Sequence, residues 1–176
     1  MVAYKKAVFF DRDGTLIETF FSKKKKIPIA IKHIKDLKIV KGSKEVINKL
    51  SKKYLILIIT NQPDVSRGKN TRQNVIKINL KLKNVLKIDD IFTSYSSDDR
   101  NFMRKPNPGM IYLAKKKYKI KLEKSFVVGD TYKDILAGQK AKCKTILLKK
   151  KYNKLQKYKP DYVIKNLKDI LKIIKV

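Results

Sequence analysis

Two carboxylates separated by one residue follow the first apolar run of the chain. The run Ala7–Phe10 is succeeded by the residues Asp11-Arg12-Asp13-Gly14-Thr15. At the end of a strand, both carboxylates can face one cavity where the chain turns, and Gly14 permits that turn. A calcium-binding loop is excluded, because its twelfth position requires a glutamate and is Ser22 here. A plain turn with capping aspartates stays open as an alternative for this motif alone.

Three further polar motifs occur later, and alone they also fit, in turn, an ordinary polar strand end, a surface basic pair before a turn, and an Asp helix cap with a turn glycine. Thr60-Asn61-Gln62 offers a hydroxyl and backbone N–H groups that could hold a phosphate. Arg104-Lys105-Pro106 places a lysine just before a predicted helix start, and Gly129-Asp130-Thr131-Tyr132-Lys133-Asp134 follows another apolar run. As a set, the carboxylates and the lysine suit phosphoryl transfer. Carboxylates need Mg²⁺ to coexist with a phosphate dianion, and the lysine offsets the remaining negative charge.

Short apolar runs alternate with helical patterns, which predicts the elements that must position these motifs. The continuous apolar run at residues 54–59 is typical of a central parallel strand. We predict strands at residues 7–10, 54–59, 91–95, 125–128, 145–148 and 161–164, and helices at 43–52, 71–86, 108–118, 132–141 and 167–174, with Ser43 and Thr71 as caps. This alternation implies an α/β fold with an open, parallel central sheet. Ligands of such sheets bind beyond the carboxyl ends of the strands, where the four motifs fall.

Length and composition limit the class of protein. A chain of 176 residues, 43% of them hydrophobic, predicts a single domain over residues 1–176 that folds around a core. No apolar run approaches the ~18–20 residues of a membrane span, and the run Ala7–Phe10 is too short for a signal peptide. The single cysteine, Cys143, excludes an intrachain disulfide and a cysteine-based zinc site. We expect a cytoplasmic monomer.

The formal net charge of +30 has two interpretations. A polyanion-binding surface is one, because basic proteins attract nucleic acids through their phosphates. The other is codon composition, since Lys, Ile and Asn are encoded by A/T-rich codons. The Lys and Arg residues spread evenly over the chain, and arginine, which nucleic-acid sites favour, is scarce. Composition is therefore the favoured interpretation, and nucleic acid remains the alternative partner to a small phosphate ester.

The four motifs, in this order, resemble those of the haloacid dehalogenase (HAD) superfamily of phosphatases. The resemblance covers the chain from about Ala7 to Leu148. Thr60-Asn61-Gln62-Pro63-Asp64-Val65, Arg67-Gly68 and Arg104-Lys105-Pro106 narrow it to subfamily IIIA. Within that subfamily they are similar to the branch of histidinol-phosphatases and D-glycero-D-manno-heptose 1,7-bisphosphate phosphatases. The resemblance implies a three-layer, Rossmann-like fold.

The same resemblance implies a role for each matching residue. Asp11 would attack phosphorus to form an aspartyl-phosphate, and Asp13 would serve as general acid and then general base. Thr60 and Lys105 would stabilise the phosphoryl group. Mg²⁺ would be held by Asp11, Asp130 and the backbone carbonyl of Asp13, with Asp134 supporting its water shell. Substrate recognition would fall to Asn61, Gln62 and Arg104.

One departure from the branch, and the spacing between the motifs, bear on the substrate. Its members usually carry a Cys/His zinc loop before the Arg-Lys-Pro motif, whereas residues 96–103 are short and contain neither Cys nor His. We therefore expect no zinc. The spacing between motifs also leaves no room for a large cap domain, so we expect an open site covered at most by loops within residues 20–40.

The function expected from these features is Mg²⁺-dependent hydrolysis of a sugar phosphate. The favoured substrate is D-glycero-D-manno-heptose 1,7-bisphosphate, converted to heptose 1-phosphate for nucleotide-sugar and lipopolysaccharide synthesis. Histidinol phosphate and a polynucleotide 3′-phosphate are alternative substrates of the same chemistry. A non-catalytic anion-binding module is a further alternative, which the presence of Asp11, Asp13, Lys105 and Asp130 disfavours.

Overall fold

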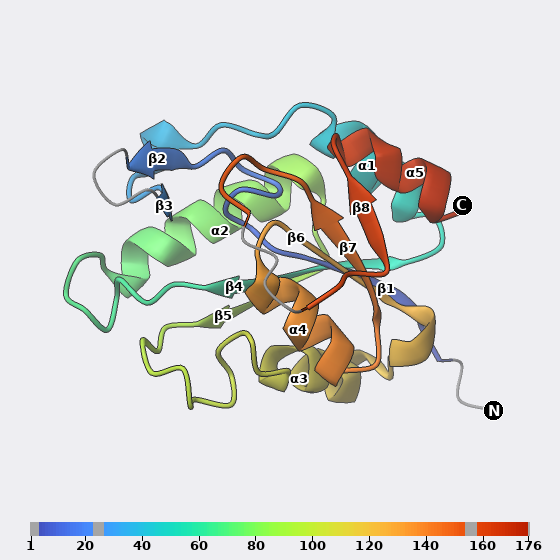
Figure 1. Cartoon of the computed structure of the whole chain (residues 1–176). Helices are drawn as coiled ribbons and strands as arrows, with labels where there is room; N and C mark the ends of the chain where they lie inside the picture. Colours follow the sequence, from blue (N-terminus) through green and yellow to red (C-terminus); the bar gives the residue numbers. More distant parts are fainter. Residues whose placement is uncertain (1–3, 23–26, 154–157, 176) are drawn as a thin grey trace.

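A computed structural model describes residues 4–22, 27–153 and 158–175 (Figure 1). Its main element is a parallel sheet of six strands in the order β5-β4-β1-β6-β7-β8. The strands are β1 (Ala7–Phe10), β4 (Leu55–Asn61), β5 (Asp90–Ser94), β6 (Phe126–Gly129), β7 (Lys144–Leu148) and β8 (Tyr162–Ile164). The helices are α1 (Ser43–Leu50), α2 (Arg72–Leu86), α3 (Gly109–Tyr118), α4 (Tyr132–Lys140) and α5 (Ile170–Ile173). The predicted α/β fold is confirmed.

Helices cover both faces of this sheet, as Figure 1 shows. On one face, side chains such as Val8, Phe10 and Ile58 pack against α1, α2 and α5. On the other face, side chains such as Phe9 and Ile59 pack against α3 and α4. Strands buried on both faces read as continuous apolar runs, which is why β1 and β4 were recognisable in the sequence. The arrangement is the predicted three-layer one.

The start of α2 agrees with the prediction, whereas those of α1 and α5 differ. The Thr71 hydroxyl accepts a hydrogen bond of 3.1 Å from the backbone N–H of Asn74, as the predicted cap requires. Ser43, however, is the first residue of α1 and not its cap; its hydroxyl lies against the carbonyl of Leu16 and its N-cap is Gly42. The predicted closing helix begins as a 3-10 turn at Leu167–Asp169 and becomes α5 at Ile170.

A two-stranded antiparallel ribbon lies in the segment predicted as loops. It consists of β2 (Phe20–Ser22) and β3 (Ile27–Ile29), with Phe20 opposite Ile29. In Figure 1 the ribbon lies toward the end of the molecule at which β4 and β5 terminate. The predicted loop cover of the site is therefore partly regular structure.

None of the described helices combines the length and the apolarity that crossing a bilayer requires.

Candidate active site

A cavity of about 600 Å³ lies beyond the carboxyl ends of the central strands. It is bounded on one side by β3 and the residues after it, and on the other by the start of α4. Every residue predicted for the site except Thr60 lines it: Asp11, Asp13, Asn61, Gln62, Arg104, Lys105, Asp130 and Asp134. Thr60 is buried directly behind this wall, where its hydroxyl accepts a hydrogen bond of 2.8 Å from the Gln62 side chain. The fold thus gathers four motifs that are far apart in the sequence.

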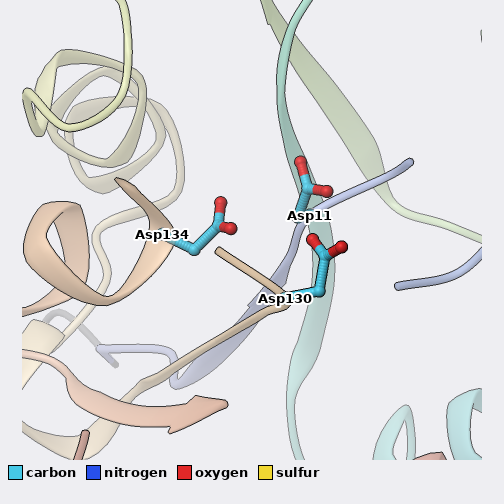
Figure 2. Close-up of side chains that lie close together, drawn as sticks. All are labelled: Asp11, Asp130 and Asp134. Atoms are coloured by element: carbon cyan, nitrogen blue, oxygen red, sulfur yellow. The ribbon is translucent and has the colours of Figure 1, made fainter. Parts of the chain in front are cut away.

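Three of the predicted carboxylates form a buried cluster (Figure 2). Asp11 follows β1, Asp130 follows β6 and Asp134 lies in α4, and each offers an oxygen within 4.8 Å of the other two. The adjacent strands β1 and β6 set the spacing, because Phe10 pairs with Val128 and the Asp11 N–H donates to the Val128 carbonyl at 2.8 Å. Gly129 lets α4 approach, since a Cβ there would lie 2.3 Å from that of Asp134.

Lys105 connects two members of this cluster. Its Nζ lies 2.6 Å from Asp11 Oδ1, 2.6 Å from Asp134 Oδ1 and 2.8 Å from the carbonyl oxygen of Ile59. Burial by itself would lower the pKa of Lys105, but the attraction of Asp11 and Asp134 outweighs it and raises the pKa. The lysine therefore stays charged and holds the Asp11 carboxylate in one orientation.

The carboxylates carry more negative charge than Lys105 balances. Burial raises the pKa of Asp11 well above its ordinary value, against the opposing effect of Lys105. Burial, reinforced by Asp134, raises the pKa of Asp130 to about 6. Asp130 Oδ1 is also buried without a hydrogen-bond partner among the described residues. A divalent cation would relieve both conditions, because it favours the charged carboxylates and takes an oxygen ligand. The residues present thus fit Mg²⁺.

Asp13 lies outside this cluster, although its side chain lines the same cavity. Its carboxylate accepts hydrogen bonds from Arg12 Nε at 2.9 Å and from Gln62 Nε2 at 2.7 Å. Arg12 is fully buried and anchored in turn by Asn79, at 2.7 Å. The two carboxylates of the first motif therefore have different surroundings, one beside Lys105 and one beside Arg12. Sequence reasoning assigned no role to Arg12 or Asn79.

Asn61 contacts the main chain of the lysine. Its Nδ2 donates to the Lys105 carbonyl at 2.9 Å, and its Oδ1 accepts from the Lys105 N–H at 3.0 Å. Both ends of the side-chain amide are engaged in this way. These contacts hold the main chain at Lys105 in place, a role of Asn61 that the sequence did not indicate.

The segment at residues 96–103, which contains neither Cys nor His, is held by hydrogen bonds. Within residues 96–103, Asp99 accepts from Arg104 Nε at 2.8 Å and from Lys133 Nζ at 2.9 Å, while Arg104 Nη1 donates to the Ser96 carbonyl at 3.0 Å. Arg104 and Lys133 both line the cavity. Asp99 thus forms ion pairs with two basic side chains of the cavity. The sequence did not indicate this role, because Asp99 appeared there only as a polar loop residue.

Residues after β7 also reach the carboxylate cluster. The hydroxyl of Tyr152 donates to Asp130 Oδ2, and Asn153 Nδ2 donates to the Asp130 carbonyl. These residues follow the lysine run 149–151, which gives the sequence the appearance of a solvated surface. No local pattern could have found this contact, because it depends on how the segment after β7 returns to the end of β6.

Comparisons with known proteins agree on one family. A family model described as HAD-hydrolase-like matches residues 102–170. A D-glycero-β-D-manno-heptose-1,7-bisphosphate 7-phosphatase of Helicobacter pylori is 32% identical over 99% of this chain and 100% of its own length. A D-glycero-α-D-manno-heptose-1,7-bisphosphate 7-phosphatase of Campylobacter jejuni is 31% identical over 97% of this chain and 96% of its own.

A similar solved structure shares the fold. The D,D-heptose 1,7-bisphosphate phosphatase of B. bronchiseptica, crystallised with magnesium and phosphate, superimposes with a TM-score of 0.78 at 24% identity. The match covers 96% of this chain and 99% of that one.

Proposed function

The chain belongs to the haloacid dehalogenase (HAD) superfamily and is a phosphatase, a hydrolase of phosphoric monoesters; from this we propose that its substrate is D-glycero-D-manno-heptose 1,7-bisphosphate, which it converts to heptose 1-phosphate. The observation that carries the chemistry is the buried Asp11–Lys105 pair beside Asp130, at the base of a cavity that a sugar phosphate can enter. The substrate is supported by the two relatives just described, which bear this activity in their names over nearly the full chain.

In this proposal Asp11 is the nucleophile. One of its carboxylate oxygens attacks phosphorus and the sugar oxygen leaves, which gives an aspartyl-phosphate that water then hydrolyses. The contact between Lys105 and Asp11 Oδ1 orients the carboxylate before the attack. Lys105 stabilises the charge on the phosphoryl oxygens, and Asn61 keeps Lys105 in place through its main chain. The hydroxyl of Thr60 lies behind the cavity wall, where it supports the side chain of Gln62.

Asp13 transfers the protons. It protonates the leaving sugar oxygen, and then removes a proton from the water that attacks the aspartyl-phosphate. Arg12 and Gln62 hold its carboxylate at the cavity wall, apart from Lys105. The proton-transferring carboxylate and the nucleophile therefore have separate hydrogen-bond partners.

Mg²⁺ would be held by Asp11, Asp130 and the main-chain carbonyl of Asp13, with Asp134 supporting its water shell. Bound there, it would neutralise the phosphate and allow an anionic nucleophile to approach. Asp134 is already fixed, because its Oδ1 contacts Lys105 and its Oδ2 accepts from the N–H and hydroxyl of Thr131 at 3.0 and 2.6 Å.

Cations around the cavity favour a substrate that carries a second anionic group. Besides Lys105, the lining includes Lys32, Arg67, Lys69, Arg104 and Lys133. A bisphosphate meets this requirement. The monophosphate of an uncharged alcohol has no second anionic group for these cations to bind. The lysine run 23–26, which the sequence also offered for a second phosphate, lies outside the described residues.

A substrate panel tests the proposal. We expect Mg²⁺-dependent phosphate release to be fastest from one anomer of heptose 1,7-bisphosphate, and slow from histidinol phosphate and from a 3′-phosphorylated oligonucleotide. Both anomers are needed because the relatives act on different ones. Preference for the oligonucleotide, with binding that weakens steeply in salt, would contradict the proposal and make the net charge functional. Preference for histidinol phosphate would also contradict the proposed substrate and identify the enzyme as a histidinol-phosphatase.

Loss of Asp99 is expected to weaken substrate binding more than turnover. Asp99→Ala removes the acceptor shared by Arg104 and Lys133, and we expect KM for the heptose bisphosphate to rise about tenfold with kcat little changed. The matched control is Asp98→Ala, since the carboxylate of Asp98 pairs with the exposed Arg100. Steady-state kinetics of both variants decide the matter; equal KM values would show that Asp99 does not support the substrate site.

A further inference from the structure

The segment after β7 packs against Asp130 at two points. The Tyr152 hydroxyl donates to the Asp130 carboxylate, and Asn153 Nδ2 donates to the Asp130 main-chain carbonyl at 2.5 Å. The segment is closed on itself, because the Lys150 N–H donates to Asn153 Oδ1 at 2.5 Å. Tyr152 therefore belongs to a short, braced loop that is directed at one carboxylate of the site.

Gly14 provides the space for this contact. Its φ is +91°, a conformation that residues with a side chain rarely adopt. A Cβ at this position would lie 2.2 Å from Asp130 Oδ2 and 2.8 Å from the Tyr152 hydroxyl oxygen. The glycine of the first motif thus allows both the turn after Asp13 and the approach of Tyr152 to Asp130.

The two carboxylate oxygens of Asp130 are in different situations. Oδ2 accepts the Tyr152 hydrogen bond, whereas Oδ1 is buried and has no hydrogen-bond partner among the described residues. A carboxylate that binds a metal through one oxygen is commonly oriented by a hydrogen bond to the other. The contact with Tyr152 has the form of such an orienting bond.

We propose that Tyr152 is a positioning residue that orients the Asp130 carboxylate for the divalent cation and so sets the affinity of the site for Mg²⁺. This inference rests on the proposed function. The donor type fits the role, because a phenol hydroxyl orients the carboxylate without adding a positive charge that would repel the cation. In a chain with 45 Lys and Arg, the residue that reaches Asp130 from a lysine-rich segment is a neutral one.

The test is Mg²⁺ binding to Tyr152→Phe, measured by isothermal titration calorimetry without substrate. Removal of the hydroxyl should raise the Kd for Mg²⁺ about tenfold or more. The shift of Tm produced by a fixed Mg²⁺ concentration should shrink accordingly, since stabilisation by a ligand falls as its Kd rises. At saturating Mg²⁺, phosphate release by the variant should return toward the wild-type rate.

Two further variants make the result specific. Tyr162→Phe removes a hydroxyl on the edge strand β8 and should leave the Kd unchanged, whereas Asp130→Asn should abolish Mg²⁺ binding. An unchanged Kd in Tyr152→Phe, with a wild-type protein that binds Mg²⁺, would overturn this inference alone. A variant whose Tm falls equally with and without Mg²⁺ would also overturn it, since packing would then be the role of Tyr152. Failure of the wild-type protein to bind Mg²⁺ would overturn the proposed function as well.

Discussion

Asp11→Asn is expected to reduce phosphate release by about 10⁴-fold or more. The amide has nearly the shape of the carboxylate but lacks the anionic oxygen that attacks phosphorus. It also removes one of the carboxylates that would hold Mg²⁺. Because Asp13 and Lys105 remain, the loss measures what Asp11 contributes as nucleophile and as metal ligand together. Initial rates of phosphate release at saturating Mg²⁺ provide the measurement.

The same substitution should leave the fold intact. Burial disfavours the charged form of Asp11, so a neutral side chain removes a desolvation cost. Lys105 keeps its contacts with Asp134 and with the Ile59 carbonyl. The free energy of unfolding, measured by urea denaturation of the metal-free protein, should therefore equal or exceed that of the wild type. As a control, Asp64→Asn changes a cavity carboxylate outside the cluster and should keep measurable activity. Near-wild-type turnover by Asp11→Asn would rule out the covalent mechanism.

Lys105→Met is expected to damage both stability and catalysis. It removes the ammonium group that joins Asp11 and Asp134 and leaves their buried carboxylates facing each other. Breaking a buried ion pair by deleting one partner costs about 3–5 kcal/mol, so the metal-free variant should unfold at a much lower urea concentration. Loss of a group that stabilises the phosphoryl charge should also lower kcat by about 10²–10³-fold.

A second lysine serves as the control for this effect. Lys117 pairs with Asp90 at 2.8 Å, but its side chain is largely exposed. Lys117→Met should therefore change stability little, because solvent screens an exposed pair. Added Mg²⁺ should restore part of the stability lost in Lys105→Met, since the cation offsets the same negative charge. Equal stability of the two lysine variants would contradict the buried-pair interpretation of Lys105.

The sequence predicted the sheet and its helices wherever the signal was local. β1 was predicted to the residue because all four of its side chains are apolar and fully buried. The start of α2 followed from Thr71, whose capping bond spans three residues. The ribbon of β2 and β3 was missed, since its two short segments are separated by a lysine run and their pairing is itself tertiary.

The four motifs and their place at strand ends were also determined by the sequence. Each motif directly follows an apolar run or precedes a helix start, and a parallel sheet brings the carboxyl ends of its strands to one edge. That arrangement suffices to predict that Asp11, Lys105 and Asp130 come together at one edge of the sheet. It does not say which side chain contacts which.

Those contacts were decided only by the tertiary structure. The first motif presents Asp11 and Asp13 as a pair. In the fold, Asp11 contacts Lys105, whereas Asp13 accepts hydrogen bonds from Arg12 and Gln62. Tyr152 reaches Asp130 from the loop after β7, and Asp99 joins Arg104 to Lys133 across two loops. Periodicity and caps record interactions between near neighbours in the chain. Partners 22 or 94 residues apart, as in the Tyr152–Asp130 and Lys105–Asp11 contacts, depend on how packed elements aim their loops, which no short stretch of sequence encodes.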